Sequence, residues 1–575
     1  MLFNVFYLFI IIVLILSVAS YILILFKCKR KAIVEILLPN GEKFKRAFKQ
    51  APGPRPWPIL GNLDIIGQFD NPFKGFGTLA NCYGDIYSLT LGHTRCLVVN
   101  NLDLIREVLN KNGKFFGGRP DFLRYHKLFG GDRNNSLALC EWSQLQQKRR
   151  NLARRYCSPR ESSSYFSKMS LIGCAEADIL MDELEKVILP GQPLELKPIL
   201  NAACANMFSQ YMCSMRFEYD DEEFKKMVWF FDEIFWEINQ GHPLDFLPWL
   251  SPFYKQHTNR IAHWSTTIRK FILNRVLEHR ELNIDPEEPD NDFTDALLKS
   301  LIENENMCRN TIIFMLEDFI GGHSAVGNLI MLVLAYIAKD PAIGRHIQCE
   351  ADFVSNEGKR SITLEDMEQM PYTMATIFEV LRYSSSPIVP HVATEDSVIS
   401  GYGVTRGTIV FINNYVLNMS ENSWKKPQNF CPERFLEETS IKNTQKLSTS
   451  NDKRKMSEGS DSGIEFEKDF VSTIDNQNNL KRPKFQLRKN LPHFLPFSIG
   501  KRTCIGQNLV RGFGFILLSN ILLRYNISSQ DISNIKINPA SLALPANCFP
   551  LILTARSSIL LIISIALQVR HISIL

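Results

Sequence analysis

A single cysteine near the C-terminal end of the sequence sits where a loop meets an apolar helix pattern. Cys504 is followed by apolar residues at helical spacing from about Gln507 to Leu523. The N–H groups and the positive dipole end of a helix N-terminus favour a thiolate. A thiolate held in this way is a strong axial ligand for haem iron. Cys504 is therefore a candidate haem ligand, and the alternative is a buried cysteine that opens a core helix.

The loop around this cysteine contains residues that suit a haem. Gly500 and Gly506 let the backbone turn tightly and approach a flat macrocycle. Arg502 can form a fork on a carboxylate such as a haem propionate. Phe497 can cover the sulfur and keep water away from it. Each of these residue types has a physical use at a haem-thiolate centre.

The loop resembles the Phe-x-x-Gly-x-Arg-x-Cys-x-Gly signature of the cytochrome P-450 superfamily, and every fixed position matches. The resemblance extends over about residues 50–556. It implies a mostly α fold with small β-sheets, in which haem b lies between a long distal helix and the proximal cysteine loop. It also implies a microsomal monooxygenase that takes NADPH electrons from NADPH-cytochrome P-450 reductase, with cytochrome b5 as an alternative donor. One oxygen atom of O2 would be placed on an apolar substrate.

Residues 311–337 form a long apolar helix pattern with Gly321 and Gly322 in its middle. Each glycine destabilises a helix by roughly 1 kcal/mol relative to alanine, so a flat group lying against the backbone would explain the pair. The resemblance makes this the distal helix, but serine and alanine stand where the superfamily has an acid and a threonine. Ser324, His323, an ordered water or a hydroxyl of the substrate could supply protons instead; we favour Ser324 or a substrate hydroxyl with water, and interpret His323 as a packing or propionate-side residue. Because neighbouring helical residues do not share a face, we do not expect Ser324 and His323 to act as a simple pair.

Trp142, Arg149 and His391 are the candidates for holding a haem propionate. The superfamily has a Trp-x-x-x-Arg motif in this helix, whereas this sequence has Gln146 four residues after Trp142. Arg149 lies seven residues after Trp142 and shares its helix face. The resemblance gives the same role to His391, and an ordinary buried histidine is the alternative. The remaining basic residues of the helix form either a solvated face or a docking site for an acidic electron donor: Lys148, Arg150, Arg154 and Arg155.

Glu379 and Arg382 are spaced so that their charges share a helix face, and Arg434 follows about fifty residues later. The pair alone is a weak signal, because surface pairs at this spacing are common. Its order relative to the later motifs resembles the Glu–Arg–Arg network on the proximal side of the superfamily. The resemblance gives all three residues a structural role.

The amino-acid composition limits the classes of protein to which the chain can belong. The chain has 575 residues, of which 45% are hydrophobic and 22% are charged, so it can bury a large core. A net charge of +5 does not indicate a nucleic-acid partner. The 13 cysteines are scattered and contain no C-x-x-C pair, which predicts reduced thiols on a cytosol-facing body.

The first 31 residues predict a membrane anchor. The stretch from Leu2 to Phe26 is apolar and long enough to span a bilayer, and four basic residues follow it within 27–31. The positive-inside rule then predicts a single-pass protein with its body on the cytosolic side. The resemblance to microsomal members of the superfamily implies that the membrane is that of the endoplasmic reticulum. A cleaved signal peptide fits less well, because the apolar run is long and no basic residue precedes it.

The chain divides into an anchor and one catalytic body. Residues 436–490 are polar and poor in aromatic side chains, which predicts a disordered insertion within that body. The predicted segments are an anchor with its basic stop at 1–31, a linker and proline-rich hinge at 32–62, a haem-thiolate catalytic domain at 63–556, and an apolar extension at 557–575.

The stretch from Asp318 to Asn328 looks like that of the insect Spook-type enzymes. These act early in the synthesis of ecdysteroids, the moulting hormones, on a sterol-derived intermediate, and this resemblance alone implies the substrate class. Two alternatives remain open. One is a haem-thiolate isomerase or dehydratase that needs no electron donor, which the missing acid–alcohol pair fits. The other is a haem-binding protein or sensor without enzymatic activity.

Overall fold

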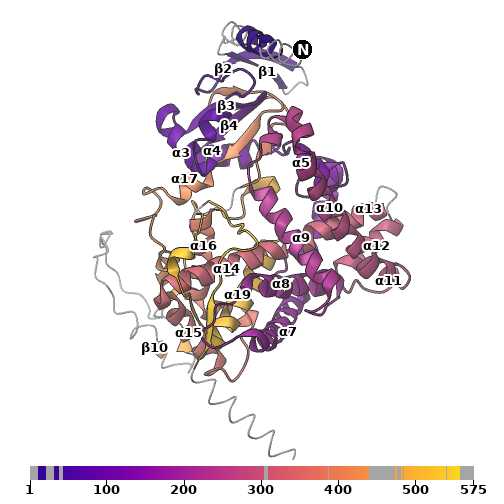
Figure 1. Cartoon of the computed structure of the whole chain (residues 1–575), viewed down its shortest axis with the longest axis vertical. Helices are drawn as coiled ribbons and strands as arrows, with labels where there is room; N and C mark the ends of the chain where they lie inside the picture. Colours follow the sequence, from indigo (N-terminus) through magenta and orange to yellow (C-terminus); the bar gives the residue numbers. More distant parts are fainter. Residues whose placement is uncertain are drawn as a thin grey trace, which may run out of the picture.

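The computed structural model describes residues 9, 11–20, 31–37, 43–303, 308–385, 388–439, 473–474, 481–482, 485–538 and 540–556. Helices make up most of the body, and the two larger sheets lie at the end of the molecule that carries the N-terminus (Figure 1). The predicted class, mostly α with small β-sheets, is confirmed.

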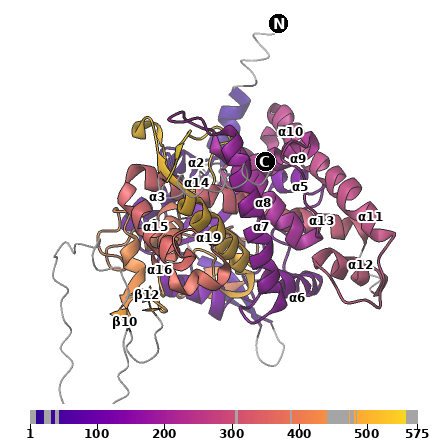
Figure 2. The ribbon, with the colours of Figure 1, turned by 90° about the horizontal axis from the view of Figure 1, so that it is seen from below.

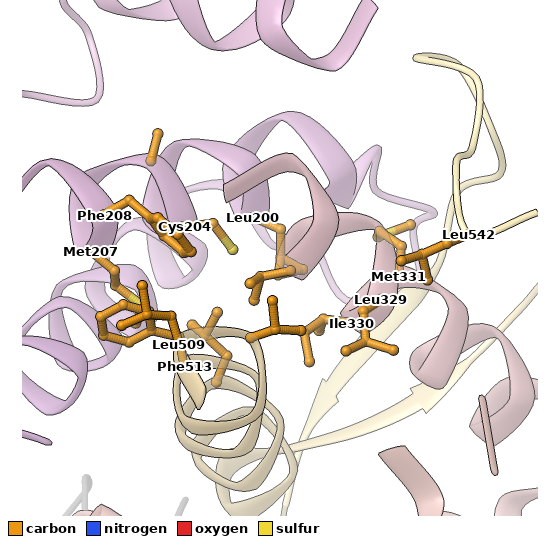
Figure 3. Close-up of a cluster of buried hydrophobic side chains, with 14 of the residues drawn as sticks. Leu200, Cys204, Met207, Phe208, Leu329, Ile330, Met331, Leu509, Phe513 and Leu542 are labelled. Carbon is orange, nitrogen blue, oxygen red and sulfur yellow. The ribbon is translucent and has the colours of Figure 1, made fainter. Parts of the chain in front are cut away.

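The centre of the helical part is α14 (His323–Lys339), which is buried along almost its whole length. It packs against α8 (Leu196–Cys213), α9 (Glu222–Asn239), α16 (Pro371–Ser384) and α19 (Gln507–Arg524). Figure 3 shows side chains of α8, α14 and α19 meeting in one apolar cluster. In Figure 2, α19 lies between α7 (Ser164–Val187) and α16. The helix that follows the cysteine loop is therefore part of the core.

The long helix predicted over 311–337 is two helices, α13 (Arg309–Ile320) and α14, separated by Gly321 and Gly322. The two glycines keep right-handed helical dihedrals, but the N–H groups of Gly322, Ser324 and Ala325 bond three residues back, so this turn is tighter than an α-helix. Within the described residues, 309–339 is the one stretch long and apolar enough to cross a membrane, and it is mostly buried as a core element.

The remaining helices surround this core. They are α2 (Leu63–Ile66), α3 (Pro72–Tyr83), α4 (Leu102–Arg106), α5 (Leu123–Leu128), α6 (Gln144–Cys157), α10 (Lys255–Phe271), α11 (Glu278–Glu281), α12 (Phe293–Glu303), α15 (Pro341–Ser355) and α17 (Asn414–Asn418). Short 3-10 turns include η3 (Pro243–Asp245), η4 (Pro248–Tyr254), η6 (Leu364–Gln369) and η8 (Gly500–Arg502).

One four-stranded sheet has the order β3-β4-β8-β5. Its strands are β3 (Ile86–Leu91), β4 (Thr94–Val99), β5 (His391–Val392) and β8 (Ile409–Ile412). The hairpin of β3 and β4 turns at Gly92, whose φ is +59°, and β8 runs parallel to β4. Because β5 pairs antiparallel with β8, the sheet fixes the backbone of His391.

The second four-stranded sheet has the order β1-β2-β7-β6. Its strands are β1 (Lys31–Leu37), β2 (Lys43–Lys49), β6 (Ser397–Ile399) and β7 (Tyr402–Val404). The prediction of a linker at 32–62 is therefore wrong for β1 and β2, because β2 pairs with β7 and the buried side chains of Ala32 and Val34 pack against Gly403.

The predicted insertion at 436–490 begins and ends in ordered structure. Strand β9 (Leu436–Glu438) pairs antiparallel with β12 (Phe485–Leu487), and Arg488 Nε donates to the carbonyl of Leu436 at 2.8 Å. The predicted boundaries are thus too wide at both ends, because these strands close the base of the insertion. Between them the structure describes β10 (Thr473–Ile474) and β11 (Lys481–Arg482), which pair with each other.

The two ends of the chain are described in part. A helix covers Ile11–Ser20 within the predicted anchor. The rest of the first 30 residues, apart from Phe9, and the predicted extension at 557–575 lie outside the described residues. The chain's last described elements are β13 (Tyr525–Ser528) and β14 (Ile552–Ala555), which form a small antiparallel sheet.

Candidate active site

The cysteine loop is closed by its own backbone. The N–H of Cys504 donates to the carbonyl of Phe497 at 2.9 Å, and η8 turns the chain between them. Gly500 has a φ of +78°, and a Cβ there would lie 2.2 Å from the carbonyl oxygen of Leu109, so no other residue fits. Gly506 caps the N-terminus of α19. The loop therefore presents Cys504 at the start of a core helix, as the sequence indicates.

The Cys504 thiol remains accessible, although protein surrounds it. Burial raises its pKa, and the N–H groups of Gly506 and Gln507 and the charge of Arg150 act in the opposite direction. The helix N-terminus alone thus does not hold a thiolate here. A bound metal ion would supply the missing positive charge, because a coordinating thiol is deprotonated.

Buried cations gather beside this loop. Arg502 Nε donates to the carbonyl of Gly117 at 2.9 Å, and its guanidinium carbon lies 5.7 Å from the centre of the Trp142 ring. Arg119 donates to the carbonyls of Ala138, Val389 and Pro390. Burial and the charges of Arg502 and Arg150 lower the pKa of Arg119 to about 9. Burial and neighbouring arginines likewise lower the pKa of Arg150 to about 10.

Several buried polar atoms near these cations have no partner among the described residues. They are Nε2 of His391, Nε of Arg149, Nε of Arg150 and both amide atoms of Gln146. Like charges packed together and unpaired N–H donors are costly to bury. An anionic group with several acceptor oxygens, such as the two propionates of haem, would accept from the guanidinium and amide N–H groups and would favour a protonated His391 that donates from Nε2. The residues present therefore fit a haem.

The structure places the predicted propionate residues in different surroundings. His391 is buried, and its Nδ1–H donates to the carbonyl of Phe116 at 2.7 Å. Trp142 packs on Gly117 and faces Arg502. Arg149 Nη2 donates to Thr311 Oγ1 at 3.3 Å, so it reaches toward the start of α13.

Two features of this cluster were missed by sequence reasoning. Arg119 belongs to it but lies in a loop without a distinctive motif. Arg150 was assigned to a surface docking face, yet its side chain is buried and donates to the carbonyl of Thr503. Lys148, Arg154 and Arg155 are exposed, as that face requires.

On the distal helix, His323 and Ser324 are both fully buried. His323 Nδ1–H donates to the carbonyl of Ile320 at 2.7 Å, which leaves Nε2 as an acceptor 3.5 Å from Ser324 Oγ. The two side chains thus come within hydrogen-bond distance although they are neighbours on the helix, because the bond to Ile320 turns the imidazole toward Ser324. Burial lowers the pKa of His323 to about 4, so the ring is neutral near pH 7.

The paired glycines of the distal helix are in close contact with two neighbouring aromatic rings. A Cβ at Gly321 would lie 2.9 Å from Phe231 of α9, and one at Gly322 would lie 3.0 Å from Phe208 of α8. Both glycines and Ala325 are half-buried, whereas His323 and Ser324 are buried on other sides of the helix. Gly321, Gly322 and Ala325 are thus the positions of this turn that a group outside the core could reach.

Glu379, Arg382 and Arg434 come together as the sequence suggests. Arg382 donates to both oxygens of Glu379 at 2.7 Å, and Arg434 Nε lies 3.1 Å from Glu379 Oε1. Glu379 and Arg382 have no exposed surface. Arg382 also donates to the carbonyls of Asn418 and Asn429, so the cluster ties α16 to the chain before η7 (Pro432–Phe435).

The described residues contain no group of three or more His, Cys, Asp or Glu side chains that could hold a bare metal ion. No disulfide joins two of the described cysteines. The accessible Cys504 thiol, a cationic cluster and a glycine-containing helix are the parts from which a cofactor site could be built.

Comparison with known proteins assigns this combination to a family. The cytochrome P450 family pattern matches residues 51–452 and 475–552, and so passes over the centre of the predicted insertion. Cytochrome P450 307a1 of Drosophila melanogaster is 64% identical over 545 residues, which is 94% of this chain and 96% of that protein. Cytochrome P450 1B1 of Mus musculus is 25% identical over 85% of this chain and 83% of its own length. Cytochrome P450 1A5 of Gallus gallus is 26% identical over 86% and 87%. The chain belongs to the cytochrome P450 family and is a haem-thiolate monooxygenase.

Proposed function

We propose that this protein oxidises a sterol-derived intermediate of ecdysteroid synthesis and that Cys504 is the axial ligand of its haem. The observation that carries the haem assignment is the accessible thiol beside a cluster of buried, partly unpaired cations. The substrate class is supported by the resemblance of residues 318–328 to the Spook-type enzymes and by the 64% identical relative. Bound haem supplies the activation of dioxygen that inserts one oxygen atom into the substrate.

Residues on both sides of the proposed haem hold and shield it. Phe497, Gly500 and Gly506 shape the thiolate loop, and Gly321 and Gly322 allow close approach of the distal helix. The propionates would be held by the cationic cluster, in which Arg119 and Arg150 join the residues predicted from the sequence: Arg502, Trp142, Arg149 and His391.

Ser324 and His323 deliver protons on the distal side. The Ser324 hydroxyl donates to His323 Nε2, so a proton that the serine gives up is replaced by water or by a hydroxyl of the substrate. This pair takes over the work of the acid and threonine that the superfamily has here. On this proposal Ser324→Ala releases hydrogen peroxide in excess of product.

Electrons arrive from NADPH-cytochrome P-450 reductase or cytochrome b5 at the proximal face. Lys148, Arg154 and Arg155 are exposed on α6. A cavity of about 660 Å³ borders the cysteine loop and is lined by Arg488, Lys489 and Arg511 among other residues. The positive charge of both features would favour docking of an acidic electron donor. The N-terminal segment holds the protein on the cytosolic side of the endoplasmic reticulum membrane.

The test is oxidation of a sterol panel by the membrane-bound protein with reductase and NADPH, followed by mass spectrometry. A product that carries one added oxygen atom and requires NADPH supports the proposal. Conversion without NADPH supports the second candidate, a haem-thiolate isomerase or dehydratase, which Ala325 at the usual threonine position favours. Oxidation of other apolar molecules but of no sterol would contradict the substrate class.

A further inference from the structure

The distal helix carries a carboxyl group on the face that a group outside the core could reach. Asp318 lies one turn before the paired glycines and seven residues before Ala325, so these positions share one helix face. All of them are half-buried, and the glycines and the alanine have no polar side-chain atom. Asp318 is therefore the polar group of an otherwise apolar face.

The loop 136–140 links this carboxyl group to the cysteine loop. The N–H of Leu137 donates to Asp318 Oδ2 at 2.5 Å, and the carbonyl of Leu137 accepts from Arg502 Nη1 at 3.4 Å. Arg502 also donates to the carbonyl of Cys140. These bonds place Asp318 on the side of the distal helix that faces the proposed haem site.

Hydrogen bonds fix the carboxyl group without saturating it. Ser136 Oγ accepts from two N–H groups of its own loop, both at 3.2 Å, and its hydroxyl donates to Asp318 Oδ1 at 3.0 Å. Each carboxyl oxygen of Asp318 thus accepts one bond from this loop, and a carboxyl oxygen can accept two. A donor group on a ligand can use the remaining acceptor sites.

No cation of the described residues accounts for this acid. The neighbouring Glu317 is buried and pairs with Arg269 at 3.2 Å, whereas Asp318 forms no ion pair within the described part of the chain. Enclosing a carboxyl group in protein without a cation is costly, so packing alone gives little reason to keep it. Burial raises the pKa of Asp318 to about 7. In either protonation state the group keeps an oxygen that accepts hydrogen bonds.

We propose that Asp318 is a specificity-determining residue that accepts a hydrogen bond from a hydroxyl group of the substrate. The inference rests on the proposed function, because a sterol combines an apolar ring system with a hydroxyl group. The glycines and Ala325 leave an apolar surface against which the rings can lie, and Asp318 holds the hydroxyl at one end of that surface. The position of Asp318 then determines which carbon of the substrate is oxidised.

The test measures how much more tightly the full-length, haem-loaded protein binds a sterol than the same molecule with hydrogen in place of its hydroxyl. Cholesterol and cholest-5-ene are such a pair, and titration of the Soret band reports their binding. The wild type should prefer cholesterol by about ten- to a hundredfold, the effect of one hydrogen bond to a charged group. Asp318→Leu should remove this preference, because it leaves no acceptor for the hydroxyl. Asp318→Asn keeps one acceptor oxygen and should retain part of the preference.

A merely structural role for Asp318 predicts a different result. If its hydrogen bonds only hold the loop 136–140, both probes should lose affinity by the same factor in Asp318→Leu, and an unchanged preference overturns the inference. Glu317→Gln is the matched control, because it alters a neighbouring buried acid whose partner is Arg269, and it should keep the wild-type preference. The carbon-monoxide spectrum checks that each variant binds haem. If Asp318→Leu does not, Asp318→Asn decides the question, since it nearly keeps the shape of the side chain.

Failure of the proposed function gives a distinguishable outcome. A wild type that binds the two probes equally overturns the inference and leaves sterol oxidation intact. A wild type that binds and oxidises no sterol contradicts the substrate class instead. The same comparison is then made with the hydroxylated and deoxygenated forms of whichever apolar molecule the wild type oxidises, and equal binding of those two forms overturns the role of Asp318.

Discussion

Removing Arg382 tests whether the buried Glu–Arg–Arg cluster stabilises the fold. In Arg382→Met the side-chain volume is nearly kept, but Glu379 loses both of its 2.7 Å bonds to the guanidinium. The carboxylate, which has no exposed surface, keeps Arg434 Nε at 3.1 Å and the N–H of Cys431 at 2.8 Å. Breaking a buried pair in this way costs about 3–5 kcal/mol.

The loss is a large share of the free energy of unfolding of a typical protein. A change of 3 kcal/mol alters the folding equilibrium constant by roughly a hundredfold. We expect a clear fall in the urea midpoint, followed by tryptophan fluorescence and by loss of the haem band. Lys225→Met, which removes an exposed pair with Glu222, is the control and should leave the midpoint unchanged. Adding Glu379→Gln to Arg382→Met should restore part of the loss, because it removes the unpaired charge. Equal midpoints for Arg382→Met and the control would refute the reasoning.

Three further outcomes follow from the structure. Replacing residues 440–484 with a short Gly/Ser linker should preserve the haem spectrum and turnover, because β9 and β12 keep the base of the insertion; loss of turnover would show that the segment is needed. Reversing the charges of Lys148 and Arg154 should slow electron transfer from reductase, and the wild-type rate should fall with salt; a salt-independent rate would argue against this face. Because burial lowers the pKa of His323 from 6.5 to about 4, the unfolded chain binds a proton between these values that the native chain does not. Stability should therefore fall as the pH drops from 6.5 toward 4, and His323→Gln should lessen that fall in urea titrations; an identical pH dependence in both proteins would contradict the buried neutral ring.

Much of the fold could be predicted from short residue patterns in the sequence. The helix after Cys504 and the Glu379–Arg382 pair on α16 were predictable, because residue spacing specifies them. The strands β1 and β2 were not, since their pairing depends on β7, more than 350 residues away. The linker prediction failed for that reason.

The candidate site likewise contains residues that the sequence predicted and residues that it did not. The Cys504 loop could be read from its motif, whereas Arg119 joins its cluster through contacts distant in the sequence. Arg150 shows the limit of helix patterns, because its side chain turns inward to Thr503 although Lys148 and Arg154 of the same helix are exposed. The pairing of His323 with Ser324 also depends on a side-chain bond to Ile320 that spacing does not reveal.

The central claim is that Cys504 ligates the haem iron, and the reduced carbon-monoxide spectrum tests it most directly. The wild-type protein should show the red-shifted Soret band of thiolate ligation. Cys504→Ser should lose that band even where haem stays bound, while Cys157→Ser, a buried thiol at the end of α6, should keep it. An unchanged band in Cys504→Ser would contradict the assignment.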